Sequence, residues 1–139
     1  MTAFSRLPVK RRSGLIERAI QAGVDYFFSV DPATADFPGE TALEPDHKWW
    51  KFGFPLFWVA DILQIADALT RLGHGNDPRL ANTLDLIMAK QDEAGRWPLE
   101  LDHYRNRMWL NYGSRGKPNK WVTLRAMRVL KQAEQQKHK

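Results

Sequence analysis

Residues 55–72 read PLFWVADILQIADALTRL and form the most apolar segment of the chain. Pro55 suits the first turn of a helix, where its missing N–H leaves no hydrogen bond unmade. The Gly-His-Gly sequence at 73–75 then favours a helix stop, because glycine readily takes the backbone conformation that ends a helix. The pattern predicts a helix over 55–72.

Apolar residues at helical spacing predict three further helices around this one. They are expected over 14–30, 78–94 and 120–135, with Ser13, Asp77 and Asn119 as N-caps. No stretch alternates apolar and polar residues over the length of a strand. The fold class is therefore predicted to be all-α.

The expected elements form two similar units, residues 14–72 and 78–136. Each contains an amphipathic helix, a long loop rich in Trp, Gly and Pro, and a second helix, as in repeat proteins. We expect one domain over 14–136, made of two α/α hairpins and preceded by a flexible basic arm at 1–13. Two repeats bury little core, so we expect a homo-oligomer, a longer parent chain, or closure by the chain's own loops.

The 139 residues carry a formal net charge of +5, and the basic excess lies at the two ends. Residues 31–46 contain five acids and no base, whereas residues 103–133 contain eight bases and no acid. These segments are interpreted either as solvated surface or as faces that meet within one chain or between two. A nucleic-acid partner is not expected, because no motif of such proteins is present.

Several classes of site are excluded by composition. The chain has no cysteine, which excludes disulfides, thiolate zinc sites, iron–sulfur clusters and a cysteine nucleophile. It has no P-loop or dinucleotide fingerprint, so no cofactor is expected. It also lacks an apolar run long enough to span a membrane and a secretory h-region, so a cytoplasmic location is expected.

Residues 91–97, QDEAGRW, have the form Q-x-x-x-G-x-W at the end of an expected helix. Glycine permits the turn, and the indole can stack beside the glutamine amide. Together with 50–61 (WKFGFPLFWVAD), 77–79 (DPR) and 120–130 (KWVTLRAMRVL), this element resembles the squalene-cyclase and prenyltransferase superfamily, and in particular its uncharacterised bacterial members. The resemblance implies a partial α/α toroid, in which outer and inner helices alternate around a cavity.

The chemistry of that superfamily does not carry over. The D-x-D-D motif of the cyclases and a D-D-x-x-D diphosphate–magnesium motif are both absent. The zinc ligands of the protein prenyltransferases include a cysteine, which this chain lacks. A terpene-cyclase or prenyltransferase activity of this chain alone is therefore not expected.

Two charged residues are candidates for a site. Asp61 lies at the edge of a polar arc beside Trp58, and desolvation of a carboxylate beside aromatic surface can produce a general acid. Alternatively, Asp61 pairs with an arginine or caps a loop amide. Arg125 lies on the same side of its helix as Trp121, where it could hold an anion in a cavity, face solvent, or pair with Asp61.

Three functions are consistent with these residues. The first is binding of an apolar or amphipathic ligand, isoprenoid-like for example, in an aromatic groove. The second is an enzyme acting on an isoprenoid or other lipid with Asp61 as the acid, and the third is a protein–protein interaction scaffold. The residues expected in the groove are Trp50, Phe54, Trp58 and Trp121, with Asp61 and Arg125 supplying polarity.

Overall fold

The computed structural model describes residues 1–35, 48–57, 59–102 and 109–138. Within these ranges only two isolated β-bridges occur and the regular structure is otherwise helical, so the all-α prediction is confirmed. The α-helices are α1 (Thr2–Ser5), α2 (Gly14–Phe27), α3 (Ile62–Arg71), α4 (Ala81–Ala89) and α5 (Lys120–Lys137), with short 3-10 helices at η1 (Val9–Arg11) and η2 (Pro78–Leu80).

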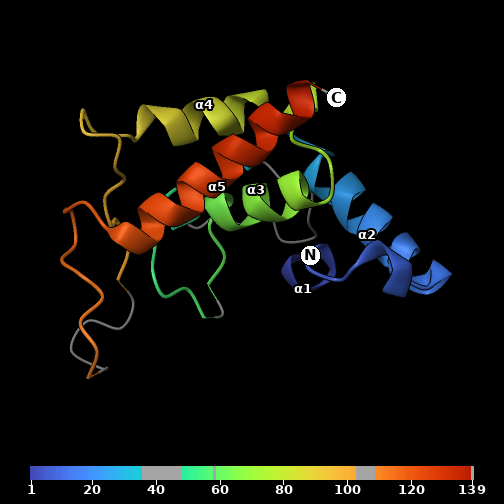
Figure 1. Ribbon diagram of the computed structural model, residues 1–139, viewed down its shortest axis with the longest axis horizontal. Helices are drawn as coiled ribbons and strands as arrows, with labels where there is room; N and C mark the ends of the chain where they lie inside the picture. The colour runs from blue at the N-terminus through green and yellow to red at the C-terminus, as the bar shows by residue number, and fades with distance from the viewer. Residues whose placement is uncertain (36–47, 58, 103–108, 139) are drawn as a thin grey trace.

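Helix α3 lies at the centre of the molecule. Figure 1 shows α5 in front of it, α4 above it, α1 below it and α2 to one side. Eight of the ten residues of α3 are buried. Its apolar residues form one broad face that packs in the core, and on the other side Asp67 and Thr70 are covered by polar side chains of α5. The core that surrounds α3 includes Val24, Ile87 and Val129, one from each of the other long helices.

The helices alternate in direction along the chain. Helices α3 and α5 run side by side in the same direction, and α2 and α4 run roughly the opposite way (Figure 1). The chain thus contains two helix–loop–helix units in the expected order, α2 with α3 and α4 with α5.

The predicted helix starts at Ser13, Asp77 and Asn119 are confirmed. Each side chain accepts a hydrogen bond from a backbone N–H of the first turn, which satisfies a group that the helix itself leaves unpaired. At Asp77 the carboxylate also accepts hydrogen bonds from the Arg79 guanidinium, and these lower the pKa of Asp77. Here the first turn is the 3-10 helix η2, and α4 follows it.

The prediction for residues 55–72 is wrong at its first turns, because the helix begins only at Ile62. Asp61 has an extended backbone and accepts a hydrogen bond from the Gln64 N–H at 2.7 Å, so it is the N-cap rather than an interior residue. Two of the other predicted helices extend too far at their C-terminal ends. The helix predicted over 14–30 ends at Phe27, and the one predicted over 78–94 ends at Ala89.

The basic arm at residues 1–13 contains regular structure. Helix α1 packs against α3, and Ser5 is buried at this contact. Met1 lies against Gly23 of α2, where even a Cβ atom would collide with its sulfur. The first residues of the chain therefore cover one side of α3.

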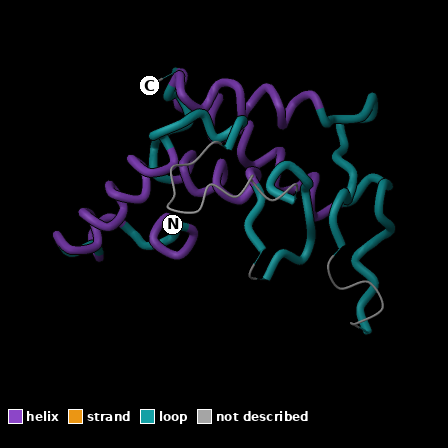
Figure 2. The backbone as a smooth tube through the Cα atoms, turned by 180° about the vertical axis from the view of Figure 1, so that it is seen from behind, coloured by secondary structure: helices purple, strands orange, loops and turns teal. Residues whose placement is uncertain are grey.

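The long loops meet at one end of the helix bundle (Figure 2). Gly53 and Leu101 form a parallel bridge, and the Lys90 ammonium binds the Glu100 carboxylate at 2.7 Å. Trp97 is 1% exposed and its indole N–H donates to the Ile87 carbonyl at 2.6 Å, so the indole is part of the core. The chain's own loops therefore close this end of the core.

Candidate functional site

A groove lies between α1, the loop before α3 and the first turns of α5, and three of the predicted site residues line it. Its volume is about 400 Å³, which is within the range of small-molecule sites. We call it the aromatic groove. It is lined by Thr2, Arg6, Phe54, Pro55, Leu56, Phe57, Gln64, Asp67, Trp121, Leu124, Arg125 and Arg128.

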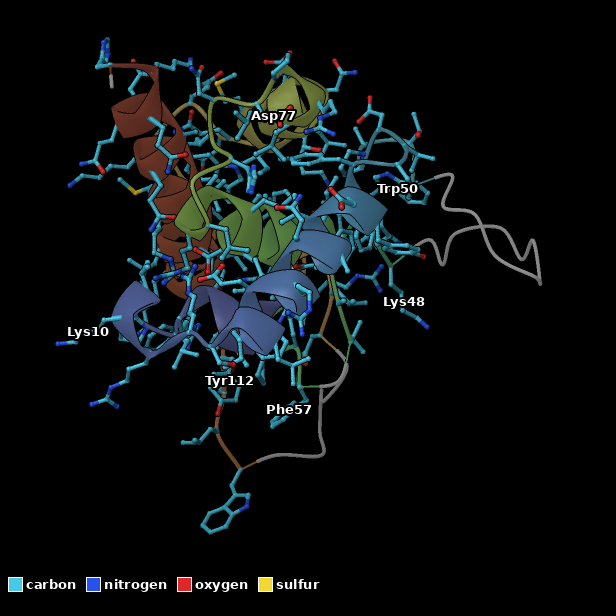
Figure 3. The ribbon with its side chains drawn as sticks, turned by 90° about the vertical axis from the view of Figure 1, so that its right-hand side faces the viewer. Lys10, Lys48, Trp50, Phe57, Asp77 and Tyr112 are labelled. Atoms are coloured by element: carbon cyan, nitrogen blue, oxygen red, sulfur yellow. The ribbon has the colours of Figure 1, made fainter. Side chains whose placement is uncertain are left out.

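The apolar wall of the groove is built on a stacked pair of rings. Phe54 and Trp121 have their centroids 5.2 Å apart and an interplanar angle of 13°. Tyr112 meets Phe54 edge-on at 5.4 Å. Phe57 also lines the groove and has a φ of 50°, an uncommon conformation for a residue with a side chain. Figure 3 shows Phe57 and Tyr112 on the same lower side of the molecule.

Behind this wall, Asp61 and Arg125 form a bidentate ion pair. The two guanidinium N–H groups donate to the carboxylate oxygens at 2.6 and 3.1 Å. Asp61 is fully buried and also accepts hydrogen bonds from the backbone N–H groups of Gly53 and Gln64. Four donors therefore surround this carboxylate, and it does not itself line the groove.

The same guanidinium fixes the loop that carries Phe54. Arg125 donates to the Gly53 carbonyl at 2.7 Å, while Asp61 accepts from the N–H of the same residue. Because these bonds hold the backbone next to Phe54, they determine where the Phe54 ring stacks on Trp121. The ion pair thus positions one wall of the groove.

A second ion pair lies about one helical turn further along α5. Arg128 of α5 binds the carboxylate of Asp67 through two bonds of 2.7 and 2.9 Å, and Arg71 reaches the same carboxylate at 3.2 Å. Asp67 is 4% exposed, whereas about a third of the Arg128 side chain is exposed. On the opposite rim, Arg6 has no ion pair with any residue that the structure describes. The charged rim of the groove is therefore cationic on balance.

The structure brings together three of the six predicted site residues. Phe54, Trp121 and Arg125 line the aromatic groove, with Asp61 directly behind Arg125. Trp50 lies elsewhere, and its indole N–H donates to the Ala33 carbonyl at 2.7 Å. Trp50 therefore does not line this groove, because the hydrogen bond holds its indole at the loop after α2, and its role in ligand binding stays a prediction. Trp58 lies outside the described residues.

Arg6 and Leu124 are among the residues of the groove that sequence reasoning missed. Arg6 follows a helix of only four residues, which is too short to produce a periodic pattern. Leu124 lies on the helix predicted over 120–135, three residues after Trp121 and four before Arg128. This spacing places it on the same side of the helix as those two residues, and it was the available signal.

The described residues contain no group of three or more His, Asp or Glu side chains that could hold a metal ion. None of the described helices is long and apolar enough to cross a bilayer. Comparisons of the chain with protein-family models, with curated proteins and with solved structures gave no match.

Proposed function

We propose that the aromatic groove binds an amphipathic small molecule with an anionic end. The observation that carries this proposal is the stack of Phe54 on Trp121 directly beside the Arg125 guanidinium, in one hollow of about 400 Å³. Aromatic and aliphatic walls bind an apolar body through area removed from water. The cationic rim supplies the attraction for an anionic end, and it includes Arg6, which has no ion pair with a described residue.

We further infer that the two helical hairpins are part of an α/α toroid. The parallel arrangement of α3 and α5 supports this inference, because the second helices of successive hairpins are the inner helices in such a ring. The aromatic groove then lies on the inner side, where α3 and α5 both contribute residues. In this proposal Asp61 is a positioning residue that holds Arg125 and the loop at Gly53.

Binding can be tested with three probes that share one alkyl chain: dodecanoate, dodecyl phosphate and dodecanol. Native mass spectrometry of the freshly purified protein first reports any molecule that it retains. Titration of each probe is then followed by tryptophan fluorescence. We expect both anions to bind more tightly than the alcohol, because only the anions can interact with the guanidinium groups.

Two tryptophan variants separate the groove from general attraction to apolar surface. Trp121→Ala removes half of the stack and should weaken dodecanoate binding by about tenfold, the effect of losing one buried aromatic contact. Trp109→Ala is the matched control, since Trp109 is fully exposed and does not line the groove. Equal affinities of these two variants would contradict the proposed function.

A further inference from the structure

The solvent side of α5 is both cationic and apolar. Lys120, Leu124, Met127 and Lys131 follow one another at helical spacing, and Lys117 comes just before the helix. We call these five residues the α5 face. Leu124 and Met127 are 54% and 55% exposed, so two large apolar side chains lie one turn apart on the same solvent-facing side of the helix.

Within the part of the chain that the structure describes, no acid neutralises the lysines of the α5 face. Lys117, Lys120 and Lys131 have no ion pair with a described residue, and the sequence from 103 to 133 contains no acid. Lys120 does interact with the Trp121 ring, at 5.2 Å from its centroid, which leaves the charge in place. By contrast, Arg79 and Arg96 each bind an aspartate close to them in the chain.

A shallow hollow of about 370 Å³ lies along the same face, between α5 and the loops that precede it. Leu124 lines both this hollow and the aromatic groove, so the two are adjacent. The hollow is lined by Arg96, Pro118, Asn119, Lys120, Thr123, Leu124 and Met127. Apolar surface in a depression, with Arg96 and Lys120 among its lining residues, can receive an apolar group whose carrier is negatively charged.

The composition of the face favours one kind of partner. The cores of protein interfaces are poor in lysine and prefer arginine and aromatic residues, whereas the cations of this face are lysines. A surface for nucleic-acid phosphates needs no exposed Leu or Met. Lysines attracted by anionic headgroups, beside apolar side chains that enter the headgroup region, are typical of binding at a bilayer surface.

We propose that the α5 face docks the protein onto the surface of a bilayer that contains anionic phospholipids. The docking is peripheral, with Leu124 and Met127 entering the headgroup region and the three lysines beside the phosphates. This inference is independent of the ligand in the aromatic groove, because it requires no occupant there.

Sedimentation of the intact protein with sucrose-loaded vesicles tests this proposal. We expect the protein to pellet with vesicles of phosphatidylcholine and phosphatidylserine, to remain in the supernatant with phosphatidylcholine alone, and to be released by added salt. Lys120→Glu combined with Lys131→Glu should lower the affinity for the anionic vesicles about tenfold or more. Met127→Gln keeps the charge and should still lower it about threefold.

The matched control is Lys10→Glu combined with Arg11→Glu. It changes the net charge by the same amount, at exposed residues on a different part of the surface. This control should bind the anionic vesicles within about twofold of the unmodified protein. Circular dichroism of each variant establishes that the helices are intact.

Three results would overturn the proposal. The first is that the unmodified protein does not pellet with anionic vesicles. The second is an equal loss in both double variants, which would mean only that a basic protein is attracted to negative charge. The third is full binding by Met127→Gln together with competition by heparin, which would assign the face to a polyanion such as a nucleic acid.

Discussion

At the scale of single residues, the structure depends on polar side chains that are buried with their partners. Asp61 is fully buried and Asp67 is nearly so, and each accepts two bonds from an arginine of α5. A buried ion pair contributes little compared with a well-packed apolar pair, but removal of one member leaves an uncompensated charge. Loss of a single member of either pair is therefore expected to be costly, although the intact pair contributes little net stability.

Asp61→Asn is expected to lower the free energy of unfolding by about 3 kcal/mol, because it leaves the Arg125 guanidinium without its anion. Arg125→Met should have a similar effect, because it leaves the Asp61 carboxylate buried without its cation. The double variant should be more stable than the sum of the two losses predicts, by about 1–3 kcal/mol. Urea denaturation measures all three values.

The control for this cycle is Asp85→Asn, at an exposed position of α4, which should change stability by less than about 0.5 kcal/mol. Additive effects of the Asp61 and Arg125 variants would show that the two side chains do not interact in solution. If Asp61→Asn instead leaves stability unchanged and abolishes probe binding, Asp61 acts directly in ligand binding or catalysis rather than as a positioning residue.

Asp77 provides a prediction about pH. Hydrogen bonds from Arg79 lower the pKa of Asp77 in the folded protein, so its carboxylate contributes stability that is present above the pKa of the unfolded chain. That contribution is lost as the pH falls through the lowered folded-state pKa. Asp77→Ala should reduce stability by about 1 kcal/mol at neutral pH, and the difference from the unmodified protein should shrink in acid.

Urea denaturation over a series of pH values measures this change, with Asp77→Asn as the control that keeps an N-cap oxygen but not the charge. A difference between Asp77→Ala and the unmodified protein that is the same at every pH would mean that the charge of Asp77 does not contribute to stability.

At the scale of elements, α3 is fixed by neighbours that approach it closely. The turn after α3 comes so near α5 that a Cβ atom on Gly75 would lie 2.8 Å from the Ala133 Cα. The Gly75 N–H also donates to the Gln136 side chain at 2.6 Å. This turn can therefore stay against α5 only while position 75 has no side chain.

Gly75→Ala is expected to force this turn away from α5 and to lower the free energy of unfolding by about 1–3 kcal/mol. Gly14→Ala is the control, since a Cβ there would have its nearest neighbour at an ordinary 3.7 Å. Thermal unfolding followed by circular dichroism compares the two variants. Equal melting temperatures would show that the turn and α5 do not approach each other as closely in solution as they do in the structure.

The helix starts could be read from the sequence because capping is local chemistry. Ser13, Asp77 and Asn119 each cap through a bond to a residue two or three positions away. The start of α3 was missed because Asp61 stands within an apolar run, where periodicity outweighs a single polar residue. The choice among the partners of Asp61 required the structure, since Arg125 lies 64 positions further along the chain.

At the scale of the whole molecule, stability should be highest around α3 and lowest at the chain start. Helix α3 is covered by α1, α4 and α5, whereas α1 consists of four residues with one of them buried. Local opening requires little free energy where few apolar contacts are lost. The molecule is therefore expected to have a rigid centre and an N-terminal segment that opens separately.

Hydrogen–deuterium exchange followed by NMR tests this expectation. The amides of α3 and of the middle of α5 should exchange only through global unfolding, and those of α1 should exchange many times faster. Because Arg6 follows α1 and lines the aromatic groove, a bound dodecanoate should slow exchange in α1. Equal protection of α1 and α3 in the free protein would contradict the proposed difference.

The polar pairs between α3 and α5 also determine how the two halves of the chain align. Asp61, Asp67 and Thr70 meet Arg125, Arg128 and Gln132 in the same order along both helices. A slip of one helical turn, about 5.4 Å, would set the Asp61 carboxylate near the buried Val129 and leave a charge unpaired in the core. The N-terminal and C-terminal hairpins can therefore pack together at only one position of α3 along α5. Two fragments produced by cleavage in the turn after α3 would bind each other in this alignment through the same polar pairs.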